Sequence, residues 1–194
     1  MALHNIVVVG GSFSGLGVAH VLLRHTIPTL ETNTSKTYKV ILISITDQFF
    51  YKIGSPRTVA SPDLIPVSKL LIPIAEGFKD YPTDHFEHVI GTATAVDEGK
   101  KTVSVKGTHG STEVAYDTIV CATGSTYNSP LWTLQTEVEE SIAEFKRFHD
   151  KIPRAESILV AGGGPAGVET AGKSPFAPLI PIPIHKPTPH LCGD

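Results

Sequence analysis

Short runs of apolar, largely β-branched residues recur along the chain, and each has the length of a buried strand. They occupy residues 6–9, 38–45, 118–122 and 157–161. Apolar runs of this kind, without strict alternation and bounded by turn residues, are typical of parallel strands that are covered on both faces. The pattern predicts an α/β fold built on a parallel sheet.

Helices and loops are predicted between these runs. A helix-length segment spans residues 16–24, and a polar connection over residues 26–37 leads into the second run, which completes a βαβ unit. Prolines exclude a long helix from residues 48–66. Residues 67–78 fit a helix interrupted near its middle by a proline, and residues 135–151 fit an amphipathic helix.

Three further strands are predicted between the second and third apolar runs. They cover residues 86–96, 101–106 and 111–116, and glycine-containing turns separate them. Strands joined by such short turns pair with their neighbours in sequence. We therefore expect a small antiparallel meander.

The first apolar run ends in a glycine-rich loop that leads directly into the first helix. Strand, glycine-rich turn and helix form the opening of a dinucleotide-binding fold, in which the helix N-terminus receives a pyrophosphate. A serine replaces the usual middle glycine, and a strand-turn-helix unit without a ligand is the alternative interpretation. The loop comprises Gly10, Gly11, Ser12, Phe13, Ser14 and Gly15.

The acidic residue that binds ribose in such folds usually ends the second strand. Ser44 occupies that position here, and the nearest carboxylate belongs to Asp47. Asp47 is predicted either to bind the ribose from the loop or to serve only as a turn residue.

A second glycine motif follows the last apolar run. Gly162, Gly164 and Gly167 complete a G-x-G-x-x-G pattern, and Pro165 suits the first position of a helix. Two such motifs with an antiparallel meander between them are more specific than either motif alone.

Composition and charge exclude several classes of protein. The chain has 194 residues and a formal net charge of −3, which gives no reason to expect nucleic acid or an anionic membrane as partner. No apolar run reaches the ~18 residues of a membrane span, and the N-terminus carries no recognisable signal peptide, so a cytoplasmic location is expected.

Cysteines and histidines suggest no redox or metal chemistry. Cys121 and Cys192 lie far apart in the sequence and form no C-x-x-C pair, which argues against a redox-active disulfide. Cys121 is interpreted as a small hydrophobe in a buried strand. His85 and His88 lack a third ligand nearby, so we interpret them as solvated histidines and predict no metal site.

Five motifs in order carry a resemblance to a known family. They read GGSFSG, FFYKIGSPR, FEHVIGTATAVD, YDTIVCATGS and VAGGGPAGVETAG. This order resembles the FAD-dependent pyridine nucleotide-disulfide oxidoreductase superfamily. The motifs look most like its apoptosis-inducing-factor-like branch, which holds the AMID and ferroptosis-suppressor type NAD(P)H oxidoreductases. The resemblance covers residues 5–172.

The resemblance implies a division of the chain. Residues 1–130 would form a Rossmann-like FAD-binding βαβ domain that includes the meander, and residues 131–153 a connecting helix. Residues 154–172 would be the first βα unit of a second, NAD(P)H-binding Rossmann domain. Residues 173–194 are proline-rich, and we expect a disordered tail there.

The resemblance also implies roles for particular residues. The first glycine loop would hold the FAD pyrophosphate and the second that of NAD(P)H. Arg57 would lie near the flavin or its phosphates, with an exposed loop cation as the alternative. Glu169 would face the nicotinamide and flavin, with a carboxylate placed only by the helix dipole as the alternative. The backbone of Ala93 would meet the adenine, and Ala122, Thr123 and Gly124 would turn the chain beside FAD.

The implied activity is an FAD-dependent NAD(P)H oxidoreductase that passes hydride from NAD(P)H to FAD and electrons on to a quinone or oxygen. After Gly172 the sequence departs from the family pattern, so we expect a chain truncated at its C-terminal side. The alternative is a non-catalytic fragment with weak or no FAD binding. The residues do not predict the electron acceptor, the choice between NADH and NADPH, or the oligomeric state.

Overall fold

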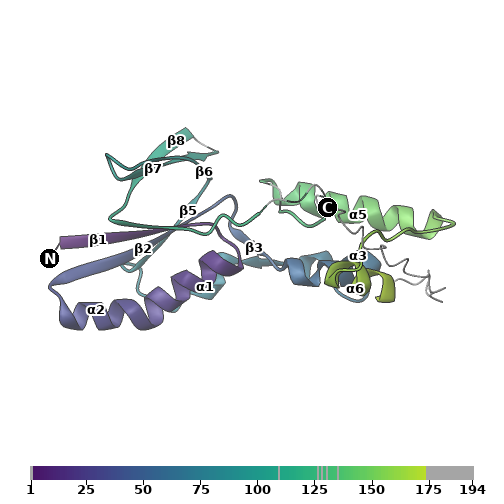
Figure 1. Cartoon of the computed structure of the whole chain (residues 1–194), viewed down its shortest axis with the longest axis horizontal. Helices are drawn as coiled ribbons and strands as arrows, with labels where there is room; N and C mark the ends of the chain where they lie inside the picture. The colour runs from purple at the N-terminus through teal and green to yellow at the C-terminus, as the bar shows by residue number, and fades with distance from the viewer. Residues whose placement is uncertain are drawn as a thin grey trace, which may run out of the picture.

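The computed structural model describes residues 2–108, 110–125, 127, 129, 131–134 and 136–173. Its centre is a four-stranded parallel sheet in the order β5-β2-β1-β9. The strands are β1 (Ala2–Val9), β2 (Lys36–Ser44), β5 (Phe86–Ile90) and β9 (Thr118–Cys121). The predicted parallel sheet is confirmed, and its first two apolar runs form the inner strands (Figure 1).

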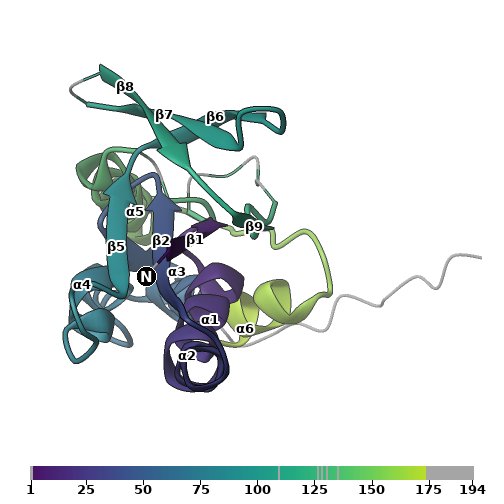
Figure 2. The ribbon, with the colours of Figure 1, turned by 90° about the vertical axis from the view of Figure 1, so that its left-hand side faces the viewer.

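Alternate residues of the inner strands pack against different layers. On one face, Val8 and Leu42 join Ala19 and Phe78 in a cluster beneath the helices. On the other face, Val7 and Ile43 pack against residues of the meander. This second cluster consists of Val7, Val9, Ile41, Ile43, Val103 and Val105. The sheet therefore lies between a helical layer and a meander, as Figure 2 shows.

The first helix is longer than its sequence pattern predicts. α1 (Phe13–Val21) continues through a π-helical turn (Leu22–Thr26) into α2 (Ile27–Asn33). The predicted polar connection over residues 26–37 is therefore wrong for most of its length. A proline near the start of α2 lacks an N–H group, and the wider π-helical turn accommodates it within a continuous helix.

The predicted strand over residues 86–96 is in fact two strands. β5 ends at Ile90 in the parallel sheet, and β6 (Thr92–Asp97) begins the antiparallel meander with β7 (Thr102–Gly107) and β8 (Gly110–Ala115). Gly91 joins them at a point where an added Cβ would lie 2.6 Å from Cγ1 of Val105. The chain can turn from one sheet to the other here because the residue has no side chain.

β9 is less buried than its apolar sequence predicts. It is an edge strand in the part of the sheet that the structure describes, and both Thr118 and Cys121 are exposed. The interpretation of Cys121 as a buried hydrophobe is wrong for that reason.

Residues 48–78 form short elements, which confirms that no long helix lies at 48–66. The single interrupted helix predicted over residues 67–78 is wrong, because its first part pairs with an earlier segment. The elements are β3 (Gln48–Phe50), a 3-10 turn (Lys52–Gly54), α3 (Ser55–Ala60), a 3-10 turn (Val67–Lys69), β4 (Leu71–Pro73) and α4 (Ile74–Phe78).

α5 (Val138–Lys151) and α6 (Pro165–Lys173) pack against α3 at the end of the molecule away from the N-terminus (Figure 1). Phe145 of α5 is completely buried in this helical part and packs with Phe50 and Leu70. The amphipathic pattern of the fifth helix therefore predicts its buried face correctly at this residue.

The strand predicted over residues 157–161 does not form in the structure. After a 3-10 turn (Ile152–Arg154) these residues pair with no strand in the described part of the chain, and Leu159 is 82% exposed. Backbone groups of a strand need a neighbouring strand, and none of the described residues supplies one here. The proline-rich tail predicted over residues 173–194 lies outside the described residues beyond Lys173.

Candidate functional site

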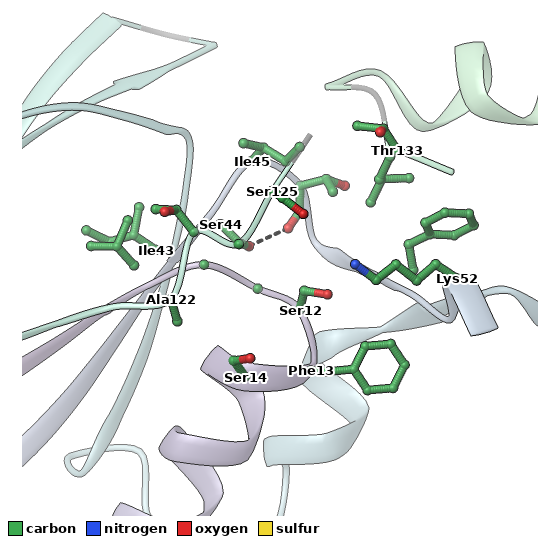
Figure 3. A pocket seen from close by; sticks show the side chains of 18 of the residues that line it. Ser12, Phe13, Ser14, Ile43, Ser44, Ile45, Lys52, Ala122, Ser125 and Thr133 are labelled. Carbon is green, nitrogen blue, oxygen red and sulfur yellow. Dashed lines mark hydrogen bonds between the residues drawn. The ribbon is translucent and has the colours of Figure 1, made fainter. Parts of the chain in front are cut away.

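A cavity of about 440 Å³ opens at the carboxyl ends of β1, β2 and β9 (Figure 3). β2 and β9 lie on opposite sides of β1, so the strand order reverses at this point. Ligands of open α/β sheets bind in the crevice at such a switch point. The topology therefore identifies this cavity as the candidate site.

The first glycine loop is fixed between two strands. The N–H of Gly10 donates to the carbonyl of Ile43 over 2.8 Å, and the N–H of Ala122 donates to the carbonyl of Val9 over 2.8 Å. Gly10 has a φ of +125°, and a Cβ added there would lie 2.2 Å from the carbonyl oxygen of Ala122. Only glycine satisfies both the backbone angle and the space.

Gly15 sets how closely α1 approaches this loop. A Cβ on Gly15 would lie 1.8 Å from the carbonyl oxygen of Gly10. The first helical hydrogen bond runs from the N–H of Leu16 to the carbonyl of Ser12 over 2.9 Å. The amides of the preceding turn therefore have no partner within the helix, and they lie beside the cavity that Ser12 and Ser14 line. This arrangement suits an anion.

The cavity lining is mostly apolar and uncharged. Lys52 is the one charged side chain among the lining residues that the structure describes, and it points into the cavity from the opposite wall to Ala122 (Figure 3). Its Nζ lies 5.3 Å from the centre of the Tyr127 ring, within cation–π distance. Sequence reasoning missed Lys52, although it directly follows the aromatic run of the second motif.

Ser44 and His88 form a hydrogen-bonded pair at the other end of the cavity. The Oγ of Ser44 lies 2.6 Å from the carbonyl oxygen of Thr46 and 2.7 Å from Nε2 of His88. Burial lowers the pKa of His88, although the charge of Asp47 opposes this effect. The interpretation of His88 as a solvated histidine is therefore wrong, because β5 places it against β2.

His85 belongs to a different environment. Its Nε2 lies 3.4 Å from a carboxylate oxygen of Glu31, away from the cavity lining. No group of three or more histidines, cysteines or carboxylates gathers within metal-binding distance among the residues that the structure describes.

The structure brings most residues of the predicted FAD site together and leaves three aside. Gly15 lies beneath the loop, and Asp47 and Arg57 are exposed and do not line the cavity. Asp47 instead accepts hydrogen bonds from its neighbours in the loop, at 3.2 and 3.3 Å. Those that line the cavity are Gly10, Gly11, Ser12, Phe13, Ser14, Ala93, Ala122, Thr123 and Gly124.

The second glycine loop repeats the local geometry of the first. Gly162 has a φ of +113°, and a Cβ on Gly167 would lie 2.2 Å from the Gly162 carbonyl oxygen. The N–H of Val168 donates to the carbonyl of Gly164 over 3.0 Å, and α6 begins at Pro165 as predicted. The loop lies outside the cavity, as does Glu169, which is part of α6.

No helix within the described ranges is long and apolar enough to cross a membrane.

Comparison with known proteins identifies relatives of this architecture. Residues 4–176 match the model of the family described as pyridine nucleotide-disulphide oxidoreductase. The oxidoreductase phnG of Penicillium herquei is 39% identical over 170 residues, covering 87% of this chain and 40% of the relative. Ferroptosis suppressor protein 1 of Homo sapiens is 28% identical over 175 residues, covering 89% of this chain and 40% of the relative.

Solved structures share the fold. NDH2 from Plasmodium falciparum, in complex with NADH, superimposes with a TM-score of 0.61 at 16% identity, covering 88% of this chain and 36% of that one. At this level of identity the likeness concerns the fold alone. The chain spans about 40% of the length of the curated relatives described above.

Proposed function

Because the chain belongs to the pyridine nucleotide-disulphide oxidoreductase family, we propose that it is the FAD-binding part of an NAD(P)H oxidoreductase. The observation that carries this proposal is the cavity at the switch point of the sheet, with a glycine loop and a helix N-terminus in its wall. An extended dinucleotide places its pyrophosphate in such a position.

The residues of the cavity suit the charge of FAD. None of the described lining residues is a carboxylate, so nothing there repels a pyrophosphate, and Lys52 adds a positive charge. The cavity volume of about 440 Å³ falls within the range of small-molecule sites. Loop residues 10–15 would bind the pyrophosphate through their amides, while Ala93 and Ser44 would lie on the adenosine side.

The opposite end of the cavity would hold the flavin. Lys52, Tyr127 and Trp132 form its wall together with the turn after β9. An apolar aromatic wall excludes water from the ring, and the ammonium of Lys52 is placed to stabilise negative charge. Arg57 would act from outside this wall only if α3 moved, since its side chain is exposed on that helix.

The second glycine loop is assigned to NAD(P)H. Gly162, Gly164, Pro165 and Gly167 would bind its pyrophosphate, and Glu169 would face the nicotinamide once the two sites are brought together. The repeated loop geometry supports the first assignment. On this basis residues 1–130 form the FAD domain, 131–153 the connection and 154–172 the start of the NAD(P)H domain.

When bound, FAD supplies the chemistry of accepting hydride from NAD(P)H and delivering electrons to a small acceptor such as a quinone or oxygen. The chain itself contributes binding and orientation: the first loop fixes the pyrophosphate, and the wall around Lys52 shields the ring system from water. The proposal includes either NADH or NADPH as the hydride donor and either a quinone or oxygen as the electron acceptor.

A second candidate function is a chain that does not catalyse hydride transfer and binds FAD weakly or not at all. The unpaired segment at residues 157–161, with Leu159 exposed, favours it, because a dinucleotide crevice needs a sheet beside the loop. The second loop also lies outside the described cavity.

One experiment separates the two candidates. The purified 194-residue chain is incubated with FAD, passed through gel filtration and examined by visible spectroscopy, and NADH or NADPH is then added to separate samples without oxygen. Bound flavin absorbance that either nucleotide bleaches supports the oxidoreductase. Bound flavin that neither nucleotide bleaches supports binding without catalysis, and a colourless protein contradicts the FAD site itself.

A further inference from the structure

The contacts of Ser44 fix where its proton lies. A carbonyl oxygen can only accept, so the Ser44 hydroxyl donates its single proton to the carbonyl of Thr46, 2.6 Å away. Nε2 of His88, 2.7 Å from the same hydroxyl, must then be the donor of the second bond. His88 therefore carries a proton on Nε2, and Ser44 keeps one lone pair without a partner in this pair of contacts.

Ser44 is buried and forms part of the cavity wall. Ser44 ends β2 and lines the cavity beside Gly11, whose added Cβ would lie 2.4 Å from that of Ser44. In dinucleotide folds this position carries the group that accepts a hydrogen bond from a ribose hydroxyl. The nearest carboxylate, Asp47, is exposed and outside the lining, so it does not supply this acceptor.

We propose that His88 is a positioning residue for the adenosine ribose. By donating to Ser44 from the neighbouring strand, it fixes the orientation of the Ser44 side chain and leaves the remaining Ser44 lone pair to accept from a ribose hydroxyl. A neutral serine–histidine pair thus takes the place of a carboxylate. The inference rests on the proposed FAD site.

The surroundings of His88 support the role. Its side chain is half-buried, and burial favours the neutral ring, so the pair adds no net charge beside the nucleotide. The negative charge of Asp47 raises the pKa of His88, but by less than burial lowers it. β2 and β5 are in parallel register here, with Leu42 opposite His88, and this pairing fixes the distance that the hydrogen bond requires.

The test compares two proteins with two ligands in a thermodynamic cycle. Wild type and His88→Phe are titrated with FAD and with an FAD analogue that lacks both hydroxyls on the adenosine ribose, and dissociation constants come from flavin fluorescence. Wild type should bind the analogue about 3- to 10-fold more weakly than FAD, as expected for a neutral hydrogen bond. His88→Phe should bind both about equally.

Two further variants define the cause. His88→Gln retains an N–H donor and should restore part of the preference for FAD, whereas Ser44→Ala should abolish that preference. His85→Gln, three residues away and paired with Glu31 outside the cavity, is the matched control and should behave as wild type. Circular dichroism melting curves confirm that each variant is folded, and His88→Leu, which also lacks the N–H donor, carries the test if His88→Phe is not.

The outcomes are distinct. If wild type binds FAD but does not discriminate against the analogue, or if His88→Phe discriminates as wild type does, the positioning role is overturned while the FAD site stands. If wild type binds neither compound, the proposed function fails and the role of His88 fails with it.

Discussion

Replacing Gly15 with alanine tests the close approach of α1 to the first loop. The added Cβ would lie 1.8 Å from the carbonyl oxygen of Gly10, far inside van der Waals contact. Gly10 cannot easily give way, because its N–H is bonded to Ile43 and its own Cα faces the carbonyl of Ala122. The helix must therefore shift away from the strand.

The expected cost follows from two opposing effects. Overpacking costs up to about 3 kcal/mol, and alanine regains ~0.5–1 kcal/mol over glycine within a helix. Gly15→Ala should thus lower the free energy of unfolding by about 2 kcal/mol, which for a chain of this size lowers Tm by roughly 4–8 °C. Urea and thermal unfolding followed by far-ultraviolet circular dichroism measure both quantities.

Gly17→Ala is the matched control on the same helix. An added Cβ there meets no atom within 4 Å, so only the helix propensity changes. We expect this variant to be about 0.5–1 kcal/mol more stable than wild type. If Gly15→Ala proved as stable as Gly17→Ala, the close packing of loop and helix described here would be wrong.

Three further variants test other parts of the molecule. Burial and Arg24 lower the pKa of His20, so its neutral form stabilises the fold above about pH 6.5, and this contribution is lost as the pH falls through the lowered pKa. The urea midpoint of unfolding, measured from pH 7.5 to 5, should therefore decline less steeply in His20→Phe than in wild type. An equal decline in both proteins would contradict this. Phe145→Ala, at a completely buried position, should cost about 3–5 kcal/mol of unfolding free energy by urea titration, and a loss under 1 kcal/mol would refute the packing of α5. Lys52→Met should weaken FAD binding roughly 5-fold, or ~1 kcal/mol, and reduce its salt dependence in fluorescence titrations, whereas unchanged binding would remove Lys52 from the site.

The sequence pattern predicts the inner part of the sheet because that part is decided locally. Residues 6–9 are apolar throughout, and residues 38–45 are apolar except at Lys39 and Ser44. Burial on two faces requires such runs. The sequence predicts the glycine loop equally well, because Gly10 and Gly15 indicate a tight turn and a close approach of helix to loop whatever surrounds them. These features are strong signals because few other structures use them.

Features that depend on distant neighbours were not predicted correctly. Nothing in residues 86–96 shows that the first half pairs with β2 and the second with β7, and Gly91 acquires its meaning only from Val105. The hydrogen bond between His88 and Ser44 has the same origin, because strand order brings them together.

The ends of helices and the burial of edge strands are also poorly predicted from the local sequence. Pro28 is a strong local stop signal, yet a π-helical turn allows the helix to continue past it. Leu159 and Cys121 have the character of strand residues, but they lack the neighbours that would bury them among the described residues. Local composition therefore marks apolar segments without predicting whether a neighbouring strand pairs with them.

Binding of the FAD pyrophosphate by the first glycine loop is tested most directly by titrating the ¹⁵N-labelled chain with FAD and measuring its amide chemical shifts. The largest shifts should fall on the amides of residues 10–14 and 122–124, which line the cavity, while residues 162–167 should shift little. Shifts confined to the second loop, or none at saturating FAD, would contradict the claim that the first glycine loop binds the FAD pyrophosphate.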